Sequence, residues 1–169
     1  MLDCLVTGGQ IVAPGGTLVA KDVGILKGKI AAIGSGLQAR QVLDAGNAIV
    51  LPGMIDLHTH LRSPLGTDGL FAGESAAAVA GGVTTVGDFA YPPGTRFEVE
   101  FRDKIEALER QSLCDFVVHT VVRSAEQLEA AKTRTVKVFL AASGLGARAG
   151  NGLELVKAAI ARGHQVLVH

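Results

Sequence analysis

The sequence has no excess of charge of either sign and very little cysteine. Its 16 Lys and Arg residues balance 16 Asp and Glu residues, and no block of basic residues occurs. Without such a block there is no electrostatic footprint for nucleic acid, so we expect no nucleic-acid partner. Cys4 and Cys114 lie far apart and form neither a CxxC metal pattern nor a disulfide framework. We interpret them as reduced structural thiols.

Long apolar runs and a leader pattern are also absent. No apolar run reaches the roughly 18 residues that suggest a membrane span, and the N-terminus lacks a charged region followed by an apolar stretch and a cleavage site. These absences predict a soluble cytoplasmic protein with no membrane partner. The apolar content of 48% is ample for a core, and 169 residues suit one domain or a little more.

Residues 1–52 predict a small unit of short strands. The pattern indicates a strand, turn and strand over residues 5–12, a hairpin over 23–33 with Gly28 at its turn, and a strand pair over 41–50. A sheet of this size has few residues to bury. We therefore expect it to pack on further structure.

From residue 53 to 169, strands and helices alternate. Strands are predicted to begin near residues 54, 83, 115, 135 and 165, and helices over 74–80, 96–110, 124–131 and 153–161. Ser124 with Gln127 fits a capping box at the start of the third helix. This alternation is typical of parallel βα units in an α/β fold.

Five such strands predict the front part of a (β/α)₈ TIM barrel, which takes roughly 250 residues when complete. The chain stops in the middle of a strand, so we expect it to be the N-terminal fragment of a longer enzyme. The alternative is an open doubly wound sheet. The missing Gly-rich phosphate turn after the first strand weakens that alternative.

The segment Asp56-Leu57-His58-Thr59-His60 ends the first strand of this series. This strand is predicted over residues 54–61, so His58 and His60 point to the same face. Two imidazoles on one side of a strand end form half of a metal site. The alternative is a pair of polar residues in a loop, but a strand that looks buried rarely ends in two histidines without a reason.

Other polar residues lie at the strand ends where a barrel places its active site. His119 and His169 end the third and fifth strands, and either is a candidate third imidazole. Asp88 fits better as a structural hydrogen-bond partner. His164 precedes its strand, so we expect it at the opposite end, facing solvent.

Lys137 is unusual because it lies inside the apolar strand Val136-Lys137-Val138-Phe139-Leu140. An unpaired ammonium in such a place costs several kcal/mol. The neutral amine can instead react with carbon dioxide to form an anionic carbamate, which would bridge two dications as a carboxylate does. The alternative is a lysine that extends past the strand end into water. The residues alone leave both open.

These motifs resemble those of the amidohydrolase superfamily. Pro52-Gly53-Met54-Ile55-Asp56-Leu57-His58-Thr59-His60 looks like its opening motif, as does the preceding pattern of residues 28–34 and 49–53. Residues 80–89, 114–119 and 136–139 are similar to the cyclic amide hydrolases: dihydropyrimidinases (hydantoinases), dihydroorotases and allantoinases. The resemblance spans the whole chain.

The resemblance implies a site with two divalent metal ions, with Zn²⁺ as the first expectation. His58 and His60 match the pair that binds one metal, Lys137 matches the carbamylated lysine that bridges both, and His169 matches a ligand of the second. The family's proton-shuttle Asp is expected beyond residue 169, so no catalytic residue is assigned here and the fragment is expected to be inactive. The resemblance also implies that residues 1–52 are part of a small β-sandwich domain and that the full-length protein is a homo-oligomer.

Two departures from the family pattern bear on the substrate. Hydantoinases have a Tyr five residues after the bridging lysine, where this sequence has Ala142, followed by Ser143 and Gly144 as in allantoinase-like sequences. Dihydroorotases hold a carboxylate with an Arg just after the second His, for which Arg62 is the candidate substrate-binding residue, and with an Asn after the second strand, which is missing here. Arg62 is equally compatible with a surface position.

The predicted function is therefore hydrolysis of a cyclic amide or ureide ring by a metal-bridging hydroxide, as in dihydropyrimidinases, with dihydroorotase or allantoinase as alternatives. A second class is a non-catalytic, dihydropyrimidinase-related scaffold protein. The retention of four predicted ligands argues against it. A third alternative is a standalone product of 169 residues, whose open strand edge would invite partner binding.

Overall fold

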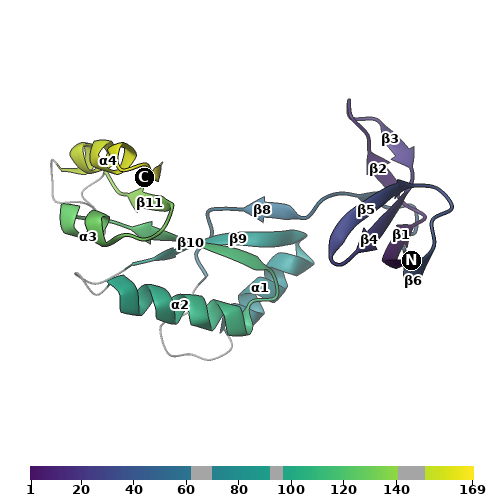
Figure 1. Ribbon diagram of the computed structural model, residues 1–169, viewed down its shortest axis with the longest axis horizontal. Coiled ribbons are helices and arrows are strands. Elements are labelled where there is room, and N and C mark those ends of the chain that lie inside the picture. The colour runs from purple at the N-terminus through teal and green to yellow at the C-terminus, as the bar shows by residue number, and fades with distance from the viewer. Residues whose placement is uncertain (62–69, 92–96, 141–150) are drawn as a thin grey trace. The chain divides into compact units, whose positions relative to one another are not determined.

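The computed structural model describes residues 1–61, 70–91, 97–140 and 151–169, with Leu70 and residues 97–100 as backbone alone. The chain divides into two compact units, Met1–Pro52 and Gly53–His169, and each unit has its own sheets (Figure 1). No helix among these described residues is long and apolar enough to cross a membrane.

The first unit contains two sheets. One has the order β5-β4-β1-β6, formed by β1 (Leu2–Thr7), β4 (Asp22–Leu26), β5 (Lys29–Gly34) and β6 (Ala39–Asp44). The other has the order β3-β2-β7, formed by β2 (Gln10–Val12), β3 (Leu18–Ala20) and β7 (Ile49–Val50). The predicted hairpin is confirmed as β4 and β5. Lys27 and Gly28 at its turn both have positive φ, 51° and 71°, as a type I′ turn requires.

The strand, turn and strand predicted over residues 5–12 are confirmed as β1 and β2, which lie in different sheets. The strand pair expected over residues 41–50 is wrong, because β6 and β7 also lie in different sheets. Gly8, with φ of 68°, and Gly46, with φ of 56°, turn the chain out of one sheet and into the other. As a result, β6 runs parallel to β1, and β7 runs parallel to β2. The β-sandwich stays a prediction.

The second unit is built on a five-stranded parallel sheet. Its strands are β8 (Met54–Asp56), β9 (Val83–Ala90), β10 (Asp115–Val121), β11 (Thr135–Val138) and β12 (Gln165–Val168). They are joined in turn by α1 (Leu70–Ala80), α2 (Phe97–Gln111), α3 (Ala125–Ala130) and α4 (Gly152–Ala161). The described strands lie in the order β12-β11-β10-β9-β8, so the sheet order never reverses. This is the pattern of a half-barrel and not of a doubly wound sheet. Closure into a complete barrel stays a prediction.

Side-chain alternation divides these strands between two faces. The helix-covered face holds two apolar clusters. Ala90 and Val118 pack with α1 and α2, and Val136 and Val138 pack with α3 and α4. Residues one position away point to the other face, where Phe89, Val121 and Phe139 form a third cluster. Lys137, between Val136 and Val138, therefore faces the same side as Phe89 and Phe139.

The start of α3 confirms half of the predicted capping box. The Ser124 hydroxyl accepts a hydrogen bond from the Gln127 backbone N–H at 3.3 Å. The Gln127 side-chain oxygen accepts from the backbone N–H of Arg123 at 2.8 Å, one residue before the cap.

Candidate metal centre

The predicted metal ligands lie at the carboxyl ends of three strands of the second unit. His58 and His60 follow β8, Lys137 is the next-to-last residue of β11, and His169 follows β12. Because all the strands of this sheet are parallel, their carboxyl ends share one edge. The same edge is where an α/β sheet of this kind holds its ligands.

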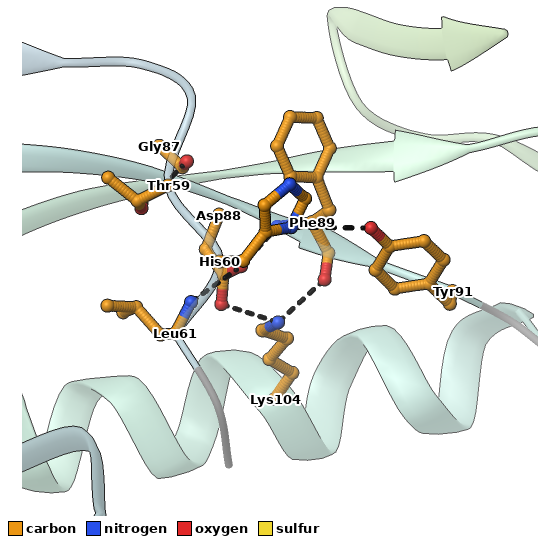
Figure 2. Close-up of polar contacts among 8 residues, drawn as sticks. All are labelled: Thr59, His60, Leu61, Gly87, Asp88, Phe89, Tyr91 and Lys104. Carbon is orange, nitrogen blue, oxygen red and sulfur yellow. Dashed lines mark hydrogen bonds and ion pairs between the residues drawn. The ribbon is translucent and has the colours of Figure 1, made fainter. Parts of the chain in front are cut away.

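The strand predicted over residues 54–61 is shorter than expected, because β8 ends at Asp56. The Asp56 carboxylate accepts a hydrogen bond from the backbone N–H of His58 at 3.0 Å, which turns the chain out of the strand. His58 and His60 therefore lie on an irregular segment. Thr59 ties this segment to β9, since its N–H and hydroxyl both donate to the Gly87 carbonyl, at 2.7 and 3.0 Å (Figure 2).

The structure brings three of the four predicted ligands together. Lys137 Nζ lies 3.0 Å from His58 Nε2, and the ring centroids of His58 and His60 are 5.4 Å apart. His169 is placed differently. Its ring packs on Phe139 at 4.8 Å, and no hydrogen bond or ring pair joins it to the other three in the described part of the chain.

Lys137 is buried, with 1% of its surface exposed, although its side chain ends in an amine. Among the described residues no carboxylate pairs with it. Its Nζ instead faces the rings of Phe89 at 4.1 Å and Phe139 at 4.9 Å. Two cation–π contacts supply at most a few kcal/mol, which is no more than the several kcal/mol that burying an ammonium costs. Burial accordingly lowers the pKa of Lys137, which favours the neutral amine over the ammonium.

Phe89 is the central contact of this site, and sequence reasoning missed it. Its fully buried ring lies within 5.0 to 5.2 Å of the rings of His58, His60 and His119. The available signal was strand alternation, which puts Phe89 on the face opposite to Asp88. Phe89 thus provides an apolar floor beneath polar side chains, and this floor lowers the local dielectric around them.

The His60 imidazole is exposed, but partial desolvation lowers its pKa below 6.5. The charge of a protonated Lys137 would lower this pKa further. A neutral imidazole is the form that binds a metal. Tyr91 lies nearby, with its hydroxyl 3.4 Å from His60 Nδ1 (Figure 2). Burial, and after it the carboxylate of Asp88, raises the pKa of Tyr91, so its hydroxyl keeps its proton.

His119, the other candidate imidazole, belongs to the core. Its Nε2 lies 3.1 Å from the Leu57 carbonyl, to which it donates, and its Nδ1 contacts the Thr135 hydroxyl. Burial lowers the pKa of His119 as well. Both ring nitrogens are therefore engaged. His164 lies at the opposite end of β12, as predicted, but it is half-buried and donates from Nδ1 to the Thr133 carbonyl at 2.9 Å instead of facing solvent.

Asp88 is the structural hydrogen-bond partner that the sequence predicted. Its Oδ1 accepts from the backbone N–H groups of Leu61 and Phe89, and its Oδ2 pairs with Lys104 of α2 at 2.6 Å (Figure 2). Sequence reasoning missed Lys104. Its signal was a charged residue three positions after Phe101 and four before Leu108, on the apolar face of α2.

The donor set fits a divalent metal only in part as it stands. In the described part of the chain, no group of three or more His, Cys, Asp or Glu side chains lies close enough together to hold a metal ion. The two imidazoles of His58 and His60 suit zinc, and a buried neutral amine beside them becomes an oxygen donor if it is carbamylated. Arg62, Ala142, Ser143 and Gly144 lie outside the described residues.

The fold is an α/β half-barrel with its candidate site at the carboxyl ends of the parallel strands, and comparison with known proteins narrows the class of protein. No family model matches the chain. An allantoinase of Solibacter usitatus is 39% identical over 125 residues, which are 70% of this chain and 26% of the relative. A dihydroorotase of Methanothermobacter thermautotrophicus is 35% identical over 131 residues, which are 73% of this chain and 30% of the relative.

Comparison with solved structures also finds hydrolases of similar fold. A D-hydantoinase from Bacillus sp. AR9 matches 99% of this chain and 40% of its own, with a TM-score of 0.80 and 29% identity. The atrazine chlorohydrolase TrzN of Arthrobacter aurescens TC1, solved with zinc, matches 98% of this chain with a TM-score of 0.55 and 18% identity, a likeness of fold alone.

The chain is thus similar in sequence and in fold to cyclic amide hydrolases, and the resemblance predicted from its motifs is confirmed. It spans about a quarter to a third of the length of the curated relatives.

Proposed function

We propose that this chain is part of a metal-dependent hydrolase that opens a cyclic amide or ureide ring, as hydantoinases do. The single observation that carries the proposal is the buried amine of Lys137, 3.0 Å from His58 and without a carboxylate partner among the described residues. A structural lysine would be paired or solvated, whereas a lysine that forms a carbamate must be available as the neutral amine. The similarity to allantoinases, dihydroorotases and a D-hydantoinase supports the reaction class.

In this proposal His58, His60, a carbamylated Lys137 and His169 hold two divalent ions, with zinc the first expectation. The Lys137 nitrogen attacks carbon dioxide, a nitrogen–carbon bond forms, and the amine releases a proton. The amine thereby becomes an anionic group with two oxygen donors. When bound, the divalent ions lower the pKa of a water to about 7 and polarise the substrate carbonyl.

The chain's own residues prepare the site for that chemistry. Partial burial lowers the pKa of His60, which favours the neutral imidazole that binds a cation. Phe89 and Phe139 cover Lys137 and keep water away from its amine. The Tyr91 hydroxyl, which keeps its proton, is a donor at the rim next to His60.

The specific ring stays open between the hydantoinase, allantoinase and dihydroorotase types. Ala142, in place of the hydantoinase Tyr, favours an allantoinase-like substrate, and Arg62 is the proposed contact for a substrate carboxylate. A direct comparison of substrates is therefore the test. The protein expressed from its complete gene would be assayed with zinc and bicarbonate on dihydrouracil, hydantoin, allantoin and dihydroorotate.

Opening of at least one ring, lost in His58→Ala but retained in the exposed control Lys157→Met, is the expected result. A well-folded, metal-free protein that opens none of the four would contradict the proposal and favour the scaffold alternative.

A further inference from the structure

The carboxylate of Asp88 holds the backbone next to His60 in place. Asp88 is 1% exposed, and its Oδ1 accepts from the Leu61 N–H at 3.3 Å and from its own neighbour Phe89 at 2.7 Å. Leu61 directly follows His60. A single carboxylate oxygen thus joins β9 to the segment that carries the imidazole (Figure 2).

Among the described residues, few backbone hydrogen bonds hold this segment next to His60. It lies beyond the end of β8, so strand pairing does not hold it. Thr59 is bonded to the Gly87 carbonyl on one side of His60, and Leu61 is bonded to Asp88 on the other. The two bonds flank His60 and both lead to adjacent residues of β9. Losing the second would leave the backbone of His60 held on one side only.

Lys104 fixes the orientation of this carboxylate from outside the site. It reaches from α2 to Asp88 Oδ2 at 2.6 Å and donates to the Phe89 carbonyl at the same distance. Its side chain is 16% exposed and that of Asp88 is 2% exposed. Asp88 and Ala90 face the helices, whereas Phe89 faces the candidate centre, so Lys104 does not touch the predicted ligands.

We propose that Lys104 and Asp88 are positioning residues that set the orientation of His60 and thereby the metal affinity of the centre. The ion pair with Lys104 holds the Asp88 carboxylate so that its Oδ1 accepts from the Leu61 N–H. This hydrogen bond and those of Thr59 to Gly87 hold the backbone on both sides of His60. The inference rests on the proposed function, because it takes His60 as a metal ligand.

The test is the zinc affinity of the protein expressed from its complete gene, measured by competition with a chromophoric chelator. Lys104→Met is expected to weaken zinc binding by up to about 10-fold, the lower end of the range for groups that contact a metal ligand directly, because Lys104 acts through Asp88 and Leu61. Lys104→Arg keeps the cation and is expected to recover most of that loss. Lys157→Met, which removes the exposed pair with Glu154 on α4, is the matched control and should leave the affinity unchanged. Parent-like affinity in Lys104→Met overturns the inference.

If Lys104→Met does not fold, two double variants still test the inference. Each replaces both Asp88 and Lys104 with uncharged side chains, so neither leaves a buried charge unpaired. Asp88→Asn with Lys104→Met keeps an acceptor for the Leu61 N–H, and Asp88→Leu with Lys104→Met removes it at similar volume. The variant with Asn is expected to bind zinc more tightly. Equal affinities for the two overturn the inference.

The two proposals fail in different ways. Zinc binding with these differences, but without opening of any ring, removes the proposed function and leaves the inference standing. Ring opening, together with a zinc affinity that does not change in the Lys104 and Asp88 variants, overturns the inference alone. A parent protein that binds no zinc overturns both.

Discussion

At the scale of single residues, Lys137 lies where its ammonium would have neither water nor a carboxylate partner in the described structure. The contacts that remain are two aromatic faces and one imidazole nitrogen. These contacts tolerate a neutral amine better than a cation, because desolvation outweighs the cation–π attraction. The buried amine is thus presented to His58 and not to a carboxylate among the described residues.

Replacing Lys137 with Ala should abolish two-metal binding, because the bridging oxygens are lost. Metal content per protein, measured by atomic emission after gel filtration, should fall from about two to one or none. Short carboxylic acids such as acetate or propionate should restore part of the metal and the activity, since they supply the missing oxygens. Undiminished metal content in Lys137→Ala would refute the bridging role.

The free energy of unfolding of the metal-free protein should fall in mild acid, because His119 then becomes protonated more readily in the unfolded chain. Because burial holds its pKa below 6.5, the unfolded chain takes up a proton at a higher pH than the folded chain does. This contribution to stability is complete above about pH 6.5 and is lost as the pH falls toward the lowered folded pKa. Urea unfolding at about pH 7.5 and pH 5.5, with chelator present, measures it.

The matched variant for this measurement is His119→Gln, whose amide still donates to Leu57. The loss of unfolding free energy between the two pH values should be smaller in His119→Gln than in the parent. An identical loss in both proteins would mean that His119 is not the group that titrates.

At the scale of elements, the irregular segment after β8 depends on the close approach of two backbones. A Cβ atom at Gly87 would lie 2.6 Å from Leu57 Cα and 2.6 Å from its carbonyl oxygen, both backbone atoms. Only glycine fits there without moving the segment that carries His58 and His60. The position of the candidate centre therefore depends on a residue with no side chain.

Gly87→Ala should destabilise the protein by about 1–3 kcal/mol, the usual cost of forcing extra volume into a packed site. It should also weaken zinc binding, because Leu57 and the following residues must shift. Gly73→Ala is the control: Gly73 lies in α1 with no atom within 4 Å of the added Cβ, and the change should stabilise by roughly 0.5–1 kcal/mol. Equal effects on zinc binding would contradict the close-approach argument.

At the scale of the whole molecule, the predicted ligands come from segments that follow β8 and β12 and from β11. A cation held by all three would link these strands in the folded state and would have no equivalent site in the unfolded chain. Metal binding should therefore be coupled to global stability, by about 2.7 kcal/mol when free zinc is 100 times the dissociation constant.

Thermal unfolding with and without chelator tests this coupling. Removal of zinc should lower the melting temperature of the parent. The same treatment should leave the melting temperature of His58→Ala nearly unchanged, since that variant already lacks a ligand. If the melting temperature of the parent protein is the same with and without zinc, the three segments do not share a cation.

Much of the fold could be predicted because its signals are local. Alternating strands and helices, the β4–β5 hairpin and the Ser124 cap each depend on residues a few positions apart. The same locality explains the errors. The length of β8 depends on an Asp56 turn and on Gly87 of another strand, and the pairing of β1 and β6 crosses between distant segments.

The sequence by itself determined which residues were available for chemistry: two histidines two positions apart, a lysine within an apolar strand, and a histidine at the end of another strand. Only the tertiary structure decided which of them meet. Lys137 and His58 are 79 positions apart, yet Lys137 Nζ lies 3.0 Å from His58 Nε2. His119 instead bonds within the core, and Lys104 reaches Asp88 from a helix. The physical reason is that a pattern in the chain sets which face a side chain points to, whereas its partner is set by the packing of elements remote in sequence.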